Sequence, residues 1–323
     1  MIKLVDPAVT LLPDTIPNLE RIEFCGRTCY NSRKKIAPGT AKKFFETIVH
    51  NGHESVLEHS NLVVKTITDE ATQNMREILQ ETEQIMGRPH YIRNCGNRNA
   101  DALYCDNIWS GNLRAWRNVV KIFTGEALLY NLFGNSTLFE DIYLCYHRTV
   151  FGKDTSLFTA PDFTKRDRGI LLEEDPEHRD EHKILTFDII CDRAIANEIV
   201  RHRVLSFSQQ STRYCNYSGE IHFVRPWWMH DDDSNFPEEK RMFEAATEDA
   251  EFFYNRIVEK GNKPQFARAW LPNCLATELC ATGTVRMWRD FLKLRNTSAA
   301  HPDMQIIAEK IDALMRSLNA QKV

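Results

Sequence analysis

The sequence lacks long hydrophobic runs and glycine-rich loops. None of its 323 residues belongs to a run approaching the roughly 18 consecutive apolar residues of a membrane span, and the start, Met1 to Asp6, lacks the apolar stretch of a secretory signal. No Gly-x-Gly-x-x-Gly and no phosphate loop occur, so a phosphorylated ligand would have to be held by side chains and helix ends. We also recognise no internal repeat.

Cysteine spacing and net charge narrow the classes of protein further. The nine cysteines form no Cys-x-x-Cys pair, which favours reduced thiols in a cytoplasmic protein. A net charge of −4 argues against a nonspecific nucleic-acid binder, which is normally basic. Hydrophobic residues make up 42% and charged residues 27%, as in globular proteins. We expect a cytoplasmic protein with neither a membrane nor a nucleic acid as partner.

One segment is unusually rich in Arg, Ser and Gln. Arg201-His202-Arg203 is followed, after seven residues, by Ser211, and then by Arg213. Guanidinium groups keep their charge at any working pH and match phosphate oxygens in pairs. The segment is therefore suited to an anionic ligand rich in hydrogen-bonding groups, although a solvated helix end would have a similar composition.

The residues before this segment predict a strand followed by a helix. Residues 184–191 are nearly all apolar, as in a buried strand, and Asp192 is a good N-cap. We expect a helix over 193–202, in which Glu198, Arg201 and His202 share one face. Charges at the end of a core strand–helix unit favour a binding site.

A second polar cluster, His-Glu-Ser-Val-Leu-Glu-His, covers residues 53–59. Two His and two Glu in seven residues permit a zinc site, but the order differs from the His-Glu-x-x-His that places two ligands on one helical face. We therefore expect no metal, and a zinc-dependent hydrolase using His53, Glu54, Glu58 and His59 stays an alternative. A nucleic-acid-binding module using Arg201 to Arg203 is a further alternative, which the acidic net charge disfavours.

Together these motifs resemble those of the flavin-dependent thymidylate synthases. Arg-His-Arg, seven residues and Ser is similar to that family's signature, and the 53–59 stretch is similar to its flavin-contacting His-Glu-Ser/Thr-x-x-Glu-His. Ala267-Arg268 before Leu271-Pro272, and Phe291-Leu292 before Leu294-Arg295, resemble two further family elements. The resemblance covers about residues 18–60 and 184–316.

The resemblance implies a fold, a reaction and an assembly. It implies an α/β fold of the α+β type, a mixed twisted sheet flanked by helices, in a single domain over 1–323 with a largely helical insertion at about 70–181. It implies a methyltransferase that converts dUMP to dTMP with 5,10-methylenetetrahydrofolate as carbon donor and NADPH, through FAD, as reductant. It also implies a homotetramer with shared active sites.

The resemblance assigns ligands to individual residues. FAD would be bound by His53, Ser55, Glu58, Arg201, His202, Arg203, Gln209, Thr284, Arg286 and Asp290. The nucleotide dUMP would be bound by Glu198, Arg201, Gln209, Gln210, Ser211, Arg213, Arg268 and Arg295. Arg295 would be the catalytic residue, facing the pyrimidine and stabilising negative charge as N3 ionises.

Some positions depart from the family pattern, and one expectation concerns the absence of covalent catalysis. Gln209, Asp290 and Cys29 stand where some members carry Glu, Asn and Ser. No cysteine follows a proline, as the nucleophile of the flavin-free thymidylate synthases does, so we expect no enzyme cysteine to attack the uracil ring. Ser211 is read as a hydrogen-bond donor, because a nucleophilic serine needs an adjacent base.

Overall fold

The structure is a computed structural model that describes residues 3–66, 69–87, 92–94, 108–122, 170–173, 180–219, 221–229 and 235–320. The chain divides into two compact units. Unit 1 holds Met1–Ile16, Phe24–Ile36 and Leu185–Val323, and unit 2 holds Pro17–Glu23 and Ala37–Ile184. The expectation of a single domain over 1–323 stays a prediction.

Unit 1 is built on a four-stranded sheet in the order β2-β7-β10-β8. Its strands are β2 (Ala8–Leu11), β7 (Ile184–Asp192), β10 (Ala276–Thr284) and β8 (Ser206–Gln209). Strand β2 runs antiparallel to β7, and β8 runs antiparallel to β10. The apolar run at 184–191 correctly predicts β7, in which five side chains are buried.

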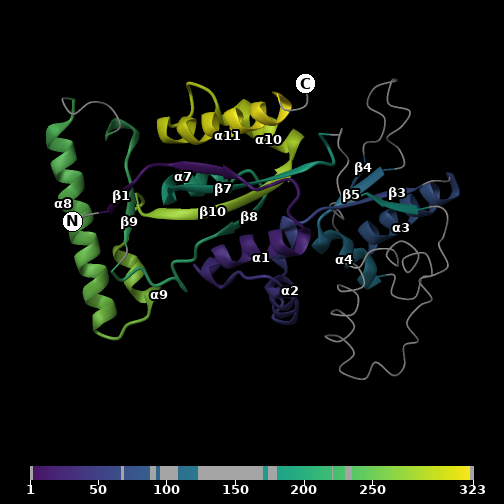
Figure 1. Cartoon of the computed structure of the whole chain (residues 1–323), viewed down its shortest axis with the longest axis horizontal. Helices are drawn as coiled ribbons and strands as arrows, with labels where there is room; N and C mark the ends of the chain where they lie inside the picture. The colour runs from purple at the N-terminus through teal and green to yellow at the C-terminus, as the bar shows by residue number, and fades with distance from the viewer. Residues whose placement is uncertain are drawn as a thin grey trace. The chain divides into compact units, whose positions relative to one another are not determined.

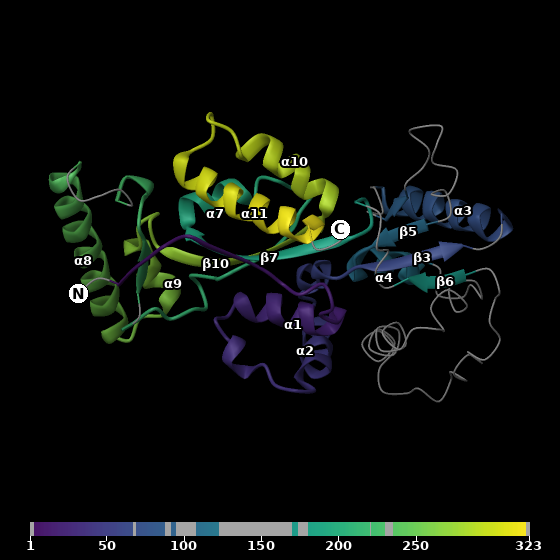
Figure 2. The same cartoon turned by 45° about the horizontal axis from the view of Figure 1, so that its top comes forward.

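Three helices pack on this sheet and complete the core of unit 1. They are α7 (Arg193–Ile199), α10 (Val285–Arg295) and α11 (Pro302–Ala320). In both cartoon views α10 and α11 lie along the same side of β7 and β10 (Figures 1 and 2). The core joins Phe187 of β7 to Trp288 and Phe291 of α10, with the two rings of Phe187 and Trp288 edge to face at 4.7 Å.

Side-chain caps fix where two of these helices begin. The Asp192 carboxylate accepts from the backbone N–H of Ile195 at 2.8 Å, as its position predicts. The Thr284 hydroxyl accepts from the N–H of Met287 at 3.3 Å. Since each capping residue is the last residue of a sheet strand, the caps set the direction in which the polar residues of each helix leave the sheet.

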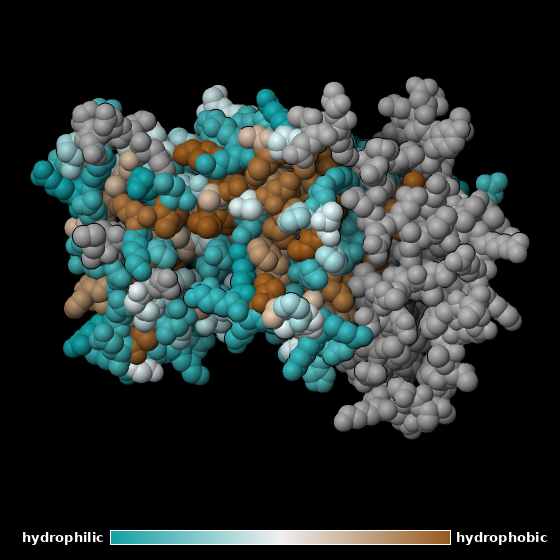
Figure 3. All heavy atoms as spheres, in the orientation of Figure 1, coloured by the Kyte–Doolittle hydropathy of each residue, from teal (hydrophilic) through white to brown (hydrophobic). Residues whose placement is uncertain are grey.

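The rest of unit 1 packs around a smaller sheet in which β1 (Lys3–Val5) pairs in parallel with β9 (His222–Val224). The helices there are α8 (Pro237–Glu259) and α9 (Pro264–Ala267), with short 3-10 turns η3 (Trp227–Met229) and η4 (Arg268–Trp270). Tyr254, Phe223 and Leu275 form its core. Figure 3 shows hydrophobic surface gathered near the middle of the viewed face, whereas α8 is largely hydrophilic.

Unit 2 contains a second four-stranded sheet, in the order β4-β5-β3-β6, with every neighbouring pair antiparallel. Its strands are β4 (Arg93–Asn94), β5 (Ile108–Gly111), β3 (Leu62–Thr66) and β6 (Ile170–Glu173). Its helices are α2 (Thr40–His50), η2 (Glu54–His59), α3 (Asp69–Met86) and α4 (Leu113–Ile122). Phe45, Leu57, Met75 and Trp116 fill its core.

Two further segments, α1 (Asn18–Thr28) and η1 (Arg33–Lys35), connect β2 to α2 along the chain.

The mix of helices and sheets confirms the expected α/β class. The described part of 70–181 holds helices α3 and α4, as expected of a largely helical insertion, and it also holds strands β4, β5 and β6, which the sequence did not predict. The rest of the expected insertion lies outside the described residues. Among the described helices, none is long and apolar enough to cross a membrane.

Candidate active site

The Arg-His-Arg segment lies just beyond α7 rather than within it. The predicted helix over 193–202 is too long, because α7 ends at Ile199 and the chain then turns. Backbone N–H groups of Arg201 and His202 donate to the carbonyls of Glu198 and Ile199, which closes the last turn. As a result Arg201 and Arg203 have exposed side chains, whereas His202 is half-buried.

Arg295, at the end of α10, is held by two residues from the α7 end. Its Nη1 donates to a carboxylate oxygen of Glu198 at 2.9 Å, and its Nε donates to Nε2 of His202 at 2.9 Å. The His202 ring stands edge to face on Phe291, with ring centroids 4.7 Å apart. The structure thus brings together Glu198, His202 and Arg295, three residues that the sequence motifs assign to one site.

The His202 ring is kept neutral by its surroundings. Burial lowers the pKa of His202 below its ordinary value, and the Arg295 cation lowers that pKa further. A neutral ring leaves Nε2 unprotonated, as it must be to accept the hydrogen bond from Arg295. The arrangement presents a fixed cation at the end of α10, on an Arg295 side chain that is 24% exposed.

The Gln-Gln-Ser run continues from β8 along the edge of the sheet. Gln209 donates through Nε2 to the Thr277 hydroxyl at 3.3 Å. Gln210 is buried and bonds twice to Glu278 of β10, since its N–H donates to the Glu278 carbonyl at 2.9 Å and its Oε1 accepts from the Glu278 N–H at 3.3 Å. The Ser211 N–H donates to the Cys29 carbonyl at 3.1 Å. These bonds fix the backbone from which Ser211 and Arg213 project.

Arg213 and Arg268, two of the arginines expected to bind dUMP, lie on separate elements. Arg213 is exposed, with its guanidinium 5.3 Å from the centre of the Tyr214 ring, and Tyr214 in turn contacts Tyr30 at 5.4 Å. Arg268 is exposed at the start of η4. Both charges are therefore available to a ligand.

The other cofactor-binding residues predicted in unit 1 lie at the start of α10. Thr284 is buried, and its hydroxyl caps the helix. Arg286 and Asp290 are exposed one turn apart on its surface. A hydrogen bond from Lys293 at 2.8 Å lowers the pKa of the Asp290 carboxyl.

The remaining predicted residues lie in the 53–59 stretch of unit 2, in which His53 directly precedes η2 and the others belong to it. His53 and Ser55 are exposed, and His59 is fully buried. The Glu58 carboxylate forms an ion pair with Arg114 of α4. Among the described residues, no group of three or more His, Cys, Asp or Glu side chains that could hold a metal ion gathers.

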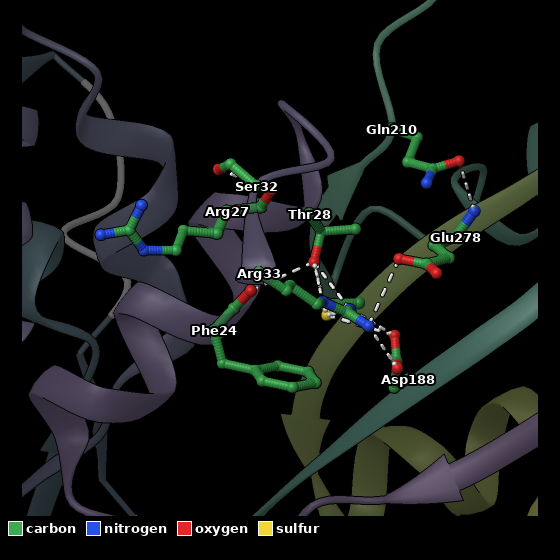
Figure 4. A network of polar contacts seen from close by, with 9 residues as sticks. Phe24, Arg27, Thr28, Ser32, Arg33, Asp188, Gln210 and Glu278 are labelled. Atoms are coloured by element: carbon green, nitrogen blue, oxygen red, sulfur yellow. Dashed lines mark hydrogen bonds and ion pairs between the residues drawn. The ribbon is translucent and has the colours of Figure 1, made fainter. Parts of the chain in front are cut away.

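The motifs missed an ion network centred on Arg33 (Figure 4). Arg33 pairs with both oxygens of Asp188, at 2.6 and 2.7 Å, and reaches Glu278 at 3.3 Å. It also donates to the Thr28 hydroxyl at 2.7 Å and lies 4.0 Å from the Phe24 ring centre. A carboxylate within each of two buried strands, β7 and β10, was the available signal, because a buried charge requires a partner.

The charges of this network are unequally stabilised. Burial alone lowers the pKa of Arg33, but hydrogen bonding to Asp188 raises it above its ordinary value. Burial raises the pKa of Glu278, an effect that Arg33 only partly offsets and that the Asp188 carboxylate increases. Since Glu278 also bonds to Gln210 through its backbone, the network anchors the strand beside the Gln-Gln-Ser run.

Comparison with known proteins identifies the family of this chain. A family model described as "Thymidylate synthase complementing protein" matches residues 10–81 and 169–318. A flavin-dependent thymidylate synthase of Kosmotoga olearia is 29% identical over 182 residues, covering 53% of this chain and 77% of the relative. One from Corynebacterium efficiens is 32% identical over 137 residues, covering 38% of this chain and 52% of the relative.

Several of these matches are partial. A flavin-dependent thymidylate synthase of Mycolicibacterium gilvum is 32% identical over 152 residues, 42% of this chain and 58% of the relative. The chain spans about half the length of the corynebacterial relatives that it matches. The family model itself covers more than half of the chain and includes the Arg-His-Arg segment and Arg295. The chain therefore belongs to the family of thymidylate synthase complementing proteins.

Proposed function

We propose that this protein is a flavin-dependent thymidylate synthase, which methylates dUMP to dTMP with 5,10-methylenetetrahydrofolate as carbon donor and NADPH as reductant. Its membership of the family and the names of its relatives support the reaction. The single structural observation that carries the proposal is the bond from Arg295 to His202. It joins the signature segment to the expected catalytic cation.

The residues available suit FAD, whose diphosphate and ring need cations and hydrogen-bonding groups. Arg201, Arg203 and Arg286 offer exposed guanidiniums, which can bind a diphosphate without a glycine-rich loop. The amide of Gln209, beside this segment, offers a further donor and acceptor. The exposed Ser55 of η2 and His53, which directly precedes η2, would supply a hydroxyl and an imidazole. When bound, FAD would supply hydride transfer between NADPH and the nucleotide.

The residues proposed for dUMP divide between phosphate and base. Arg213 and Arg268 would bind the phosphate, since both are exposed cations. Ser211, Gln209 and Gln210 would supply hydrogen bonds, and Arg201 would add charge. Arg295 would face the pyrimidine, where a permanent cation held by Glu198 stabilises negative charge developing on the ring. Its guanidinium cannot itself give up a proton at working pH.

Other features that the resemblance implies belong to this proposal. They are a homotetramer with shared active sites, a cytoplasmic location, and one catalytic domain over 1–323 with an insertion at about 70–181. Gel filtration with light scattering would test the tetramer directly.

The visible absorption spectrum of the purified protein tests the cofactor. Bound flavin would support the proposal, and the flavin released by heat should be FAD by chromatography. A colourless protein that fails to bind added FAD would contradict it. Stoichiometric zinc would instead favour the hydrolase alternative, and salt-sensitive DNA binding the nucleic-acid alternative.

A further inference from the structure

The two four-stranded sheets share one plan. Read from one edge, the strands of unit 1 run β2-β7-β10-β8, and those of unit 2 run β6-β3-β5-β4. In each sheet the second strand leads into a helix, β7 into α7 and β3 into α3, and the third strand leads into another, β10 into α10 and β5 into α4. The two sheets differ only in where the first strand of this order comes along the chain. Strand β2 precedes β7, whereas β6 follows β3.

A weak sequence similarity follows the same correspondence. Residues 110–122 align without a gap with residues 282–294. The identical pairs are Gly111 with Gly283, Arg114 with Arg286, Trp116 with Trp288, Arg117 with Arg289, and Lys121 with Lys293. The expectation of no internal repeat is therefore wrong for this segment.

The paired tryptophans make the same contact in each unit. Trp116 is fully buried and donates from Nε1 to the carbonyl of Leu62, in β3, at 3.2 Å. Trp288 is fully buried and donates from Nε1 to the carbonyl of Leu185, in β7, at 3.1 Å. Since each bond joins the helix after the third strand to the second strand, it is independent evidence for the correspondence.

Helix caps repeat at matching positions. Asn112, which aligns with Thr284, accepts through its side chain from the N–H of Ala115 at 2.9 Å. Ala115 aligns with Met287, the residue that donates to Thr284. The two helices thus begin in the same way.

Each of the paired glycines is closely approached by a side chain at an equivalent position. A Cβ on Gly111 would lie 3.0 Å from the Ile92 side chain, and one on Gly283 would lie 2.2 Å from that of Leu205. Ile92 directly precedes β4, and Leu205 directly precedes β8. The strand registers agree as well, because Ser110 pairs with Arg93 and Thr282 pairs with Ser206.

Unit 2 does not keep the ligand-binding segment. When Leu62 is aligned with Leu185, Asp69 aligns with the cap Asp192, and Met75, Ile78 and Leu79 fall at the positions of Glu198, Arg201 and His202. These three apolar side chains pack into or against the core of unit 2. Of the residues assigned to a ligand in this part of unit 1, the repeat retains the arginine near the start of its last helix, because Arg114 stands at the position of Arg286.

We propose that the sheet of unit 2 with α3 and α4 is a diverged second copy of the core of unit 1, in which Arg114 positions Glu58 for FAD. Arg114 forms an ion pair with Glu58. The N–H of Leu113, beside it, donates to the Ser60 hydroxyl at 2.9 Å. Helix α4 lies in the stretch that the family model does not match, so this chain adds its own support to the 53–59 stretch.

The inference rests on the proposed function, because Glu58 is assigned to FAD there. Arg114 is a positioning residue, acting through Glu58 and not on the cofactor. In the ligand-free protein, Arg114→Ala should therefore increase amide hydrogen exchange at residues 54–60. In FAD titrations it should raise the Kd about 3–10-fold, a modest change because the ion pair is partly exposed.

A double-mutant comparison separates positioning from direct binding. The Kd of Glu58→Ala with Arg114→Ala should equal that of Glu58→Ala alone, and Arg114→Lys should recover part of the loss. Arg256→Ala is the matched control, since it breaks an exposed Arg–Glu pair on α8 and should change neither Kd nor exchange at 54–60.

The outcomes distinguish the two proposals. A parent protein that binds no FAD overturns the proposed function, and the assignment of Glu58 to FAD falls with it. Three other results overturn the positioning role alone, while the parent still binds FAD. The first is unchanged amide hydrogen exchange at residues 54–60 in Arg114→Ala. The second is an unchanged Kd for FAD in Arg114→Ala when Glu58→Ala does weaken FAD binding. The third is a loss of FAD affinity in the double variant that equals the sum of the losses in the two single variants.

Discussion

Arg295 donates a hydrogen bond from Nε to Nε2 of His202 over 2.9 Å, and only a neutral His202 can accept it. The bond connects the end of α10 to the turn after α7, so two distant parts of the sequence share one protonation-dependent contact. A carboxylate oxygen of Glu198 accepts a hydrogen bond from Nη1 of the same guanidinium at 2.9 Å. The position of the candidate catalytic cation therefore depends on the state of one histidine.

This dependence predicts a loss of stability in acid. Because the pKa of His202 is lowered by folding, the unfolded chain takes up the proton first as pH falls below about 6.5. The contribution of His202 to the free energy of unfolding is complete above that pH and is lost as pH falls through the lowered pKa of the folded state.

The midpoint of thermal unfolding should fall less steeply with acidification in His202→Gln, whose amide oxygen accepts at any pH. His50→Gln, at an exposed site on α2, should follow the parent; an unchanged slope in His202→Gln would contradict the account.

A lysine at position 295 should impair turnover more than binding. Lys keeps the charge but cannot donate to both Glu198 and His202 in the geometry of a planar guanidinium. Loss of one charge-assisted bond corresponds to about 1.5–3 kcal/mol, so we expect kcat to fall about 10–100-fold in Arg295→Lys with a smaller change in the Kd for dUMP. Arg289→Lys, on the exposed face of the same helix, is the control. Equal losses in kcat and affinity would make Arg295 a plain binding residue.

The Arg33 network predicts unequal costs for its two carboxylates. Asp188→Asn removes the closely paired charge and should lower the free energy of unfolding by about 1.5–3 kcal/mol. Glu278→Gln should cost less than about 1 kcal/mol, because its contact to Arg33 is longer and its raised pKa shows that its charge is poorly stabilised. Urea denaturation at neutral pH measures both values. A larger cost for Glu278→Gln would reverse the assignment.

Neither Cys215 nor Ser211 is expected to act as a nucleophile. Burial raises the pKa of the Cys215 thiol, and the same holds for Cys29, so both remain protonated and weakly nucleophilic near neutral pH. The Ser211 hydroxyl accepts from the N–H of Arg213 at 3.3 Å. Cys215→Ala and Ser211→Ala should each keep substantial dTMP formation. Complete loss in either, with dUMP still bound and a covalent nucleotide adduct detected by mass spectrometry in the parent, would refute this.

The sequence predicts those parts of the fold in which local signals and burial agree. The strand at 184–191 and the Asp192 cap were both correctly predicted, because apolar runs and capping residues act over a few positions. The helix over 193–202 was predicted too long, since its polar residues suit either a helix or a turn. The bond between His202 and Arg295 could not be derived from spacing, because it depends on tertiary packing.

The network and the repeat were harder to predict. Arg33 lies in an Arg-Lys-Lys run that resembles a solvated surface, and only the fold brings it to Asp188 and Glu278. The repeat retains few identical residues, and its clearest sign, the pair Trp116 and Trp288, becomes informative only when both are seen bonded to equivalent strands.

The most direct test of the central claim is conversion of dUMP to dTMP by the purified protein, followed by chromatography. The account predicts dTMP only when 5,10-methylenetetrahydrofolate and NADPH are present and the protein carries FAD, with loss of product when either co-substrate is omitted or the flavin is removed from the protein. It also predicts that Arg295→Lys reduces the rate while dUMP remains bound. Formation of dTMP at the full rate without flavin and NADPH, or no dTMP in the complete mixture from a folded, FAD-loaded protein, would contradict the account.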